Sequence, residues 1–410
     1  MCFSVMTECR ICNTPIEPFM SLGRMPIANA FLELDDFKDE FYFELTPAIC
    51  PICATFQITE IPSPERMFHD HYAYFASTST HMTAHWQRMT DEIIRHWLFT
   101  DDPLIVEIGS NDGITLQNFA KRGIRHVGVE PSSNVAAAAR ERGVNTISAF
   151  FGVETSERIA DEYGHADIFI ATNTMHHIED INSVAAGVSK LLKTKGVFIS
   201  EDPYLGDMVD LTSYDQIYAE HMYIWSLSAL QNVFSRVGME IIDVLRTPVH
   251  GGCMRYFIGH IGEHEVSDAA KTAFECEKHM GLNTQEAFQR FRSDCEASRE
   301  TLMNLLVDLN QRGQRVVGYG APAKSTVITN YCGISSDHLE YISDSTPIKQ
   351  GKLSPGRHIP IVSPETFRAD YPDYALLFAW NHETEIFAKE TAFVDAGGQW
   401  ILPVPQTRIV

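Results

Sequence analysis

The sequence lacks any long hydrophobic run. A membrane-spanning helix needs roughly 20 consecutive, mostly apolar residues, and no stretch approaches that length. The first residues, MCFSVMTECR, lack the basic segment followed by an apolar run that marks a secretory signal. We therefore expect a cytoplasmic protein.

Positive charge is also scarce. The 54 Asp and Glu residues outnumber the 32 Lys and Arg residues, so the formal net charge is −22. Nucleic acids and anionic membranes both attract proteins through a basic surface, so we expect neither as a partner. An anionic small molecule is still compatible with this charge, because local hydrogen-bond donors can hold a phosphate within an acidic protein.

The length of 410 residues exceeds what one hydrophobic core supports and predicts two or three domains. A strand–loop–helix alternation begins at LIVEIG and a second one begins at RVVGYG, which is typical of parallel α/β sheets. Between them, residues 263–312 are polar with recurring apolar positions, and this pattern predicts long amphipathic helices. We predict an α/β protein with domains at residues 1–65, 66–262 and 263–410.

Two CxxC pairs lie near the amino terminus. They are Cys9 with Cys12 in CRIC, and Cys50 with Cys53 in CPIC. Four thiolates form the closed tetrahedral set that structural zinc prefers, and such a site has no open position for catalysis. The alternatives are buried cysteines or a redox CxxC. We predict a structural Zn²⁺ site, because two pairs within one short segment favour a metal.

The first glycine loop, in LIVEIGSNDGITL, follows a buried strand and precedes a helix. A dinucleotide would need a glycine where Asn111 stands, and carboxylates near the loop are a poor setting for a pyrophosphate. S-adenosylmethionine carries a sulfonium and an amino group instead, so acidic surroundings suit it. We therefore predict S-adenosylmethionine over a nicotinamide cofactor. The loop residues expected to bind it are Glu107, Gly109, Asn111, Asp112 and Gly113.

Polar residues at the ends of the next strands extend this cofactor site. Glu130 ends the second strand, where it could accept hydrogen bonds from the ribose hydroxyls, and Ala149 and Phe150 could flank the adenine. The fourth strand ends at Asn173 and His177. The carboxyl ends of parallel strands meet at one edge of a sheet, so we expect these residues to lie together.

The second glycine loop, RVVGYGAPAKSTVITN, matches the dinucleotide template better than the first, with Asp344 at the end of the next strand. Taken alone, it suggests a nicotinamide. The remaining chain is short for a full dinucleotide domain, however, and a helix N-terminus with Lys324 and Ser325 can equally hold a diphosphate. Asn381 and His382 follow a later strand, where the alternative role is capping a helix.

Several motifs together resemble the sugar C-methyltransferases, which methylate C-3 of a nucleotide-linked 4-keto-deoxyhexose. The resemblance spans nearly the whole chain and rests on the two CxxC pairs with LGRMPIANAF between them, VEIGSNDG, EDPYLGD, YDQIYAEH, VHGG, GYGAPAKS and LLFAWNH. It implies a zinc module, a Rossmann-like class I methyltransferase core and a C-terminal half-Rossmann domain. It also implies a nucleotide-sugar substrate, which we expect to be a dTDP-sugar with GDP as the alternative. The residues that it implies for binding this substrate are Gly320, Lys324, Ser325, Asp344, Asn381 and His382, with His250 and Gly251 of VHGG nearby.

Carbon methylation requires a base, because a C–H proton must leave before the methyl group arrives. The resemblance places His221 in this role, with Tyr218 as a donor to the ketone or enolate oxygen. If residues 214–221 were helical, these two would share a face while Glu220 pointed away. The other implied active-site residues are Glu220, His177 (aligned with the single histidine of many relatives) and Tyr72. The alternatives are O- or N-methylation of a sugar, and a nicotinamide-dependent sugar oxidoreductase.

Overall fold

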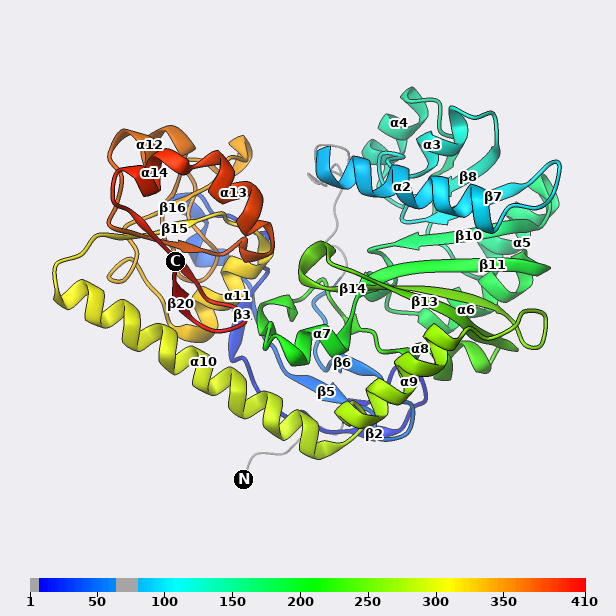
Figure 1. The fold of residues 1–410 in the computed structure, drawn as a ribbon, viewed down its shortest axis with the longest axis horizontal. Helices are drawn as coiled ribbons and strands as arrows, with labels where there is room; N and C mark the ends of the chain where they lie inside the picture. Colours follow the sequence, from blue (N-terminus) through cyan, green and yellow to red (C-terminus); the bar gives the residue numbers. More distant parts are fainter. Residues whose placement is uncertain (1–6, 64–79) are drawn as a thin grey trace.

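The computed structural model describes residues 7–63 and 80–410. Figure 1 shows the core of residues 80–262 and the C-terminal domain as two lobes, with the N-terminal segment running beneath and between them. Within the described ranges no helix is long and apolar enough to cross a membrane. The predicted Tyr72 lies outside the described residues.

The N-terminal module consists of short strands held by the cysteines. One of its sheets joins β5 and β6 to β12, a strand contributed by the core from the residues directly after His221. The module therefore does not close its sheet by itself. Its elements are β1 (Thr7–Glu8), β2 (Pro15–Ile16), β3 (Arg24–Pro26), η1 (Leu34–Asp39), β4 (Tyr42–Glu44), β5 (Pro47–Ile49) and β6 (Phe56–Ile58), joined by β12 (Tyr223–Ile224).

The core is one seven-stranded sheet in the order β13-β14-β11-β10-β7-β8-β9, in which only β14 runs antiparallel to its neighbours. The order reverses at β7, with β8 on one side and β10 on the other, which creates the switch point where such sheets bind ligands. The predicted Rossmann-like core is confirmed. Its strands are β7 (Leu104–Ile108), β8 (Arg125–Val129), β9 (Thr146–Ile147), β10 (Ala166–Thr172), β11 (Leu192–Pro203), β13 (Met239–Thr247) and β14 (Cys253–His260).

Helices cover both faces of this sheet. Every residue of β7 is buried, as expected for a parallel strand whose two faces are both covered. Ile105 packs in the cluster that contains α2, whereas Val106 packs with α5 and α6 on the opposite face. The helices are α2 (Thr80–His96), α3 (Leu116–Ala120), α4 (Ser133–Glu141), α5 (Val153–Tyr163), α6 (Ile181–Leu191), α7 (Leu205–Asp210) and α8 (Leu227–Ser235), with η3 (Met175–His177), η4 (Tyr214–Gln216) and η5 (Val249–Gly251).

Two helices connect the core to the C-terminal domain, as the polar pattern predicted. They are α9 (Asp268–Met280) and α10 (Gln285–Gln311), separated at Gly281, which adopts the left-handed conformation that ends a helix. The hydroxyl of Thr284 accepts from the amide of Ala287 and so caps the start of α10. Figure 1 shows α10 running from beneath the core to the C-terminal domain.

The C-terminal domain is a second doubly wound sheet, in the order β17-β16-β15-β18-β19-β20, with β20 antiparallel. Here the order reverses at β15, directly before the second glycine loop. Its elements are β15 (Val316–Tyr319), α11 (Ala323–Cys332), β16 (Ile342–Ser343), η6 (Pro347–Lys349), β17 (Ile361–Val362), α12 (Pro364–Ala369), β18 (Tyr374–Leu377), η7 (Trp380–His382), α13 (Glu383–Lys389), α14 (Thr391–Asp395), β19 (Gln399–Leu402) and β20 (Arg408–Ile409).

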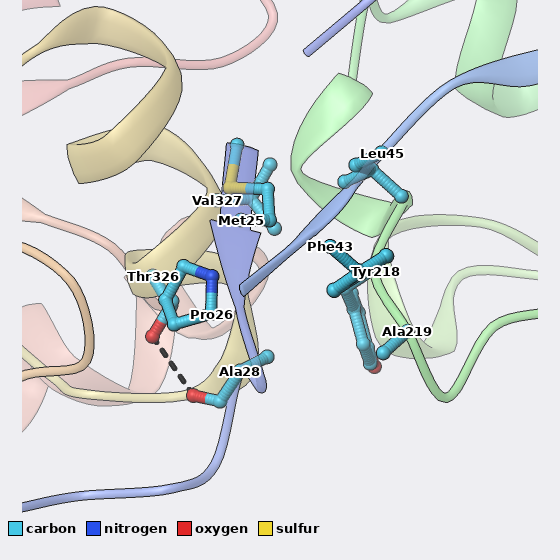
Figure 2. A pocket seen from close by; sticks show the side chains of 9 residues that line it. All are labelled: Met25, Pro26, Ala28, Phe43, Leu45, Tyr218, Ala219, Thr326 and Val327. Atoms are coloured by element: carbon cyan, nitrogen blue, oxygen red, sulfur yellow. Dashed lines mark hydrogen bonds between the residues drawn. The ribbon is translucent and has the colours of Figure 1, made fainter. Parts of the chain in front are cut away.

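The N-terminal segment contacts both larger domains. The hydroxyl of Thr326 on α11 donates to the carbonyl oxygen of Ala28 at 2.8 Å. Figure 2 shows Pro26 and Ala28 beside α11, with Tyr218 and Ala219 of the core on the other side of the same pocket. The segment thus lies between α11 and the loop that carries Tyr218.

Candidate functional site

The four predicted cysteines lie together. Their Sγ atoms are 3.5 Å apart for Cys9 and Cys53, 3.4 Å for Cys12 and Cys50, and 3.6 Å for Cys12 and Cys53. A tetrahedral zinc with Zn–S bonds of about 2.3 Å would place its sulfur ligands about 3.8 Å apart, so this set fits the ion closely. The hydrogen bond between Cys9 and Cys53 lowers the pKa of Cys9 and raises that of Cys53, and burial raises the pKa of Cys50, so zinc binding must release the protons that remain on the other thiols. We conclude that the module holds a structural Zn²⁺.

The first glycine loop bends tightly at the switch point of the core. Gly109 has φ +60°, and a Cβ there would lie 2.4 Å from Oγ1 of Thr174, so a side chain at this position would clash with Thr174. Gly113 has φ +78°, and a Cβ there would meet Val144 at 2.7 Å. Asn111 adopts φ +48° as well, a conformation that asparagine tolerates better than most residues. These positive φ values let the loop form a tight backbone cradle at the ends of β7 and β10.

Buried carboxyl groups surround this cradle. Burial raises the pKa of Glu107 to about 8, and its Oε1 accepts from the hydroxyl of Thr172 at 3.1 Å. Glu130 accepts from the amides of Asn111 at 3.1 Å and Ser132 at 2.8 Å, and burial raises its pKa too. Asp112 is buried and pairs with Arg142 at 2.7 Å. These carboxyl oxygens are hydrogen-bond acceptors beside the loop, which is compatible with S-adenosylmethionine, the cofactor predicted from the sequence.

The remaining predicted cofactor residues lie at the same edge of the sheet. Phe150 follows β9 and is 76% exposed, so its ring is available to a ligand, and Ala149 beside it is half-buried. Asn173 follows β10 with φ +49°, and its amide Nδ2 donates to Nε2 of His250 at 3.1 Å. This bond links the cofactor side of the core to the VHGG loop.

The helix considered for residues 214–221 is wrong. Only η4 is helical there, and Ile217 is extended, because the chain turns to enter β12. Tyr214 is fully buried, with its hydroxyl 3.4 Å from Sγ of Cys332, so it does not share a face with Tyr218 and His221. A turn closed by the amide of His221 and the carbonyl of Tyr218 still brings those two rings together, with centroids 3.9 Å apart.

Three histidine rings gather around this turn. The ring centroid of His221 lies 5.2 Å from that of His177 and 4.4 Å from that of His176. Nδ1 of His221 donates to the carbonyl of Gln216 at 2.7 Å, and this fixes the tautomer so that Nε2 carries the lone pair. Burial lowers the pKa of His221 well below its usual value, with the neighbouring histidines adding to the effect. His221 is therefore neutral at physiological pH, the form in which an imidazole accepts a proton.

The carboxyl group of Glu220 bonds to the N-terminal segment. Its Oε1 accepts from Nδ2 of Asn29 at 3.0 Å, and burial raises its pKa. Its carbonyl oxygen, in contrast, accepts from Nδ1 of His177 at 2.5 Å. Glu220 thus connects the N-terminal segment to the turn that carries His221, and its carboxyl oxygens make no hydrogen bond to His221.

Residues predicted to bind the substrate meet where the core and the C-terminal domain touch. Nζ of Lys324 donates to the carbonyl of His250 at 3.1 Å and to Oδ1 of Asn381 at 3.3 Å, and it lies 4.5 Å from the ring centroid of Trp380. Burial lowers the pKa of Lys324, although Asp215 partly offsets this effect. Gly251 has φ +91°, and a Cβ there would meet the Trp380 ring at 2.6 Å. The half-buried His382 ends η7, which packs on η5.

The second glycine loop is internally bonded. Oδ2 of Asp344 accepts from the amide of Ala321 at 2.6 Å, and the hydroxyl of Ser325 donates to the carbonyl of Pro322 at 2.7 Å. These two predicted residues therefore shape the loop in this structure. Gly320, with φ +79°, lets the chain turn toward α11.

Some residues of the site were not predicted from the sequence. His176 is buried and its Nδ1 lies 2.6 Å from Oδ1 of Asp202, which comes from the quoted motif EDPYLGD. Nζ of Lys349 donates to the carbonyl of Ala321 at 2.9 Å, which places a second cation beside the second glycine loop. The doubled histidine was the available signal for His176; Lys349 had none, because it ends the short helix η6, which carries no motif.

Comparison with known proteins covers all three parts of the chain. Residues 9–68 match the family described as "Putative zinc binding domain", residues 80–244 match "Methyltransferase domain", and residues 248–405 match "C-methyltransferase C-terminal domain". The chain is 35% identical over 406 residues to C-methyltransferase NovU of Streptomyces niveus, covering 98% of this chain and 96% of that protein.

More distant similarities are confined to parts of the chain. A ubiquinone biosynthesis O-methyltransferase of Bartonella quintana is 29% identical over 98 residues, which is 23% of this chain and 40% of that one. A solved S-adenosylmethionine-dependent methyltransferase from Clostridium acetobutylicum is 10% identical and covers 45% of this chain and 94% of its own, with a TM-score of 0.34. The full-length similarity to NovU and the three matching domains show that this chain belongs to the S-adenosylmethionine-dependent C-methyltransferases.

Proposed function

We propose that the enzyme methylates C-3 of a nucleotide-linked 4-keto-deoxysugar, using His221 as the base that forms an enolate. The observation that carries this proposal is the buried, neutral imidazole of His221, held by Gln216 beside the ring of Tyr218. The relationship to a C-methyltransferase supports carbon as the atom that receives the methyl group.

Proton removal from carbon explains why such a site needs these residues. A 4-keto group acidifies the neighbouring C–H bond, and a positioned neutral imidazole can then take the proton. Nε2 of His221 carries the acceptor lone pair, because Nδ1 is engaged with the Gln216 carbonyl. The Tyr218 hydroxyl serves as the donor to the developing enolate oxygen, where charge accumulates.

Bound S-adenosylmethionine supplies the electrophilic methyl group. The residues proposed to hold it are Glu107, Gly109, Asn111, Asp112, Gly113, Glu130, Ala149, Phe150 and Asn173. The hydrogen bond from Asn173 to His250 would hold the cofactor site at a fixed position relative to the substrate site. His177 donates to the carbonyl of Glu220 and lies beside the proposed base, His221. Tyr72 stays a proposed active-site residue by resemblance.

The sugar nucleotide is proposed to bind across the junction between the core and the C-terminal domain. Lys324 and Lys349 provide two cations near the start of α11, whose amide groups also favour an anion. The same junction is lined by His250, Gly251, Asn381 and His382. The second glycine loop is shaped by Gly320, Ser325 and Asp344. We assign dTDP as the nucleotide, with GDP as the alternative.

Hydrogen exchange at C-3 tests the base directly. The enzyme is incubated with a dTDP-4-keto-deoxysugar and S-adenosylhomocysteine in deuterated water, and the loss of the C-3 proton is followed by NMR. We expect exchange by the wild type, none by His221→Asn, and equal affinity of both for S-adenosylhomocysteine. Methyl transfer to oxygen or nitrogen, or unchanged exchange by His221→Asn, would refute the proposal.

A further inference from the structure

Three histidine side chains converge beside the proposed base. His176 and His177 come from η3, which follows β10, and His221 comes from the turn before β12. One ring nitrogen of each lies within 4.8 Å of those of the other two. In the described part of the chain, the zinc-module cysteines form the other group of this kind.

The second nitrogen of each ring is held in place. Nδ1 of His177 and His221 donates to backbone carbonyls at 2.5 and 2.7 Å, so Nε2 is the nitrogen with a lone pair in both rings. Nδ1 of His176 bonds to the buried carboxylate of Asp202 at 2.6 Å. Proteins use this carboxylate–histidine pairing to orient a metal ligand and raise its basicity.

We propose that His176, His177 and His221 form a second metal site, which holds a divalent transition-metal ion such as Zn²⁺ or Co²⁺ through their Nε2 atoms. Imidazole suits these ions, and three protein ligands with one open position is the arrangement of accessible zinc sites. A tetrahedral ion with Zn–N bonds of about 2.0–2.1 Å needs nitrogens roughly 3.3 Å apart, so the three rings must move closer together than their present separation of up to 4.8 Å when the ion binds.

Groups of both signs lie around the cluster. The carboxylate of Asp202 bonds directly to one ligand, and the neutral backbone carbonyl of Glu220 accepts from a second. The ammonium of Lys324 acts in the opposite direction, because it is near enough to lower the pKa of His221.

A metal at this site has a consequence for catalysis. The ion would occupy the Nε2 lone pair of His221 that the proposed base step requires. Metal binding and proton removal would therefore exclude each other, and the loaded enzyme would be a reversibly inhibited form. This consequence rests on the proposed function, whereas the metal site itself does not.

The test begins with full-length enzyme that retains its cysteine-bound zinc after dialysis against a weak chelator. Cobalt is added, and the bound metal is counted by elemental analysis together with the visible spectrum. We expect one further equivalent with the weak visible bands of nitrogen ligation, without a new thiolate charge-transfer band. His176→Gln should weaken this uptake at least tenfold, and Asp202→Asn by about 10–100-fold. The matched control is His260→Gln, a half-buried histidine outside the cluster, which should bind cobalt as the wild type does.

Each outcome decides one point. Failure of the wild type to take up a second equivalent, or uptake by His176→Gln equal to that of the wild type, would overturn the metal site without affecting the proposed function. Added Zn²⁺ should inhibit C-3 exchange in the wild type, with recovery on chelation, and should inhibit His176→Gln at least tenfold less well. Uptake without inhibition would uphold the metal site and refute His221 as the base. Binding of S-adenosylhomocysteine verifies that each variant is folded.

Discussion

Substituting Gly251 by alanine should test whether the junction between the core and the C-terminal domain depends on close packing. Two costs add at this position. The backbone has φ +91°, and a left-handed conformation costs a non-glycine residue about 1–2 kcal/mol. The new Cβ would also lie 2.6 Å from the rigid ring of Trp380, and overpacking of this kind costs about 1–3 kcal/mol. We therefore expect a destabilisation of about 2–5 kcal/mol.

Gly397 offers a matched control. It has φ +94°, and a Cβ there would meet no atom within 4 Å, so Gly397→Ala carries the backbone cost alone. Urea unfolding of both variants and the wild type measures the difference, which we expect to be about 1–3 kcal/mol. Displacement of Trp380 would also strain its 2.7 Å hydrogen bond to Asp215, so the KM for the nucleotide sugar should rise in Gly251→Ala. Equal destabilisation by the two substitutions would refute the steric argument.

Three further predictions concern the metal, the cofactor and the substrate. Cys50→Ser should lose the structural zinc, by elemental analysis, and lower the soluble yield while S-adenosylhomocysteine still binds; full zinc retention would contradict this. The pKa of Glu107 is raised from 4.5 to about 8, so its contribution to stability is present below about pH 4.5 and is lost as the pH rises through 8. Glu107→Gln should therefore flatten the fall in unfolding free energy over that range in urea titrations, whereas an unchanged slope would argue against a buried neutral carboxyl. Lys324→Met removes a cation that we propose binds the diphosphate. One hydrogen bond to a charged group is worth roughly 1.5–3 kcal/mol, so the KM for the proposed nucleotide sugar should rise at least about tenfold while the affinity for S-adenosylmethionine stays the same. Equal losses of both affinities would indicate a general folding defect instead.

Sequence patterns predicted the parts of this fold that local chemistry determines. The CxxC spacing predicted the cluster of four cysteines, and LIVEI followed by glycines predicted a buried strand with a tight turn, because both depend on neighbouring residues. The regular alternation of strands and helices predicted the two parallel sheets but not the order of their strands.

Long-range contacts could not be predicted in the same way. The turn at Tyr218 replaces a helix because the chain must pair with β6 at β12, and that partner lies far away in the sequence. Asp202 meets His176 only because β10 and β11 are adjacent in the sheet. The role of Glu220 was open for the same reason, since Asn29 binds its carboxyl group from the N-terminal module.

The pairing of β6 with β12 also constrains how the protein folds as it is synthesised. The zinc module emerges first, and its β6 edge is left uncovered until the core strand that follows His221 has been made. An exposed strand edge is prone to pair with other chains, and N-terminal domains generally form first during synthesis. Zinc binding during this interval would keep the module folded until β12 is available to pair with β6. Pairing of β12 with β6 would therefore complete that sheet and position His221 at the same time.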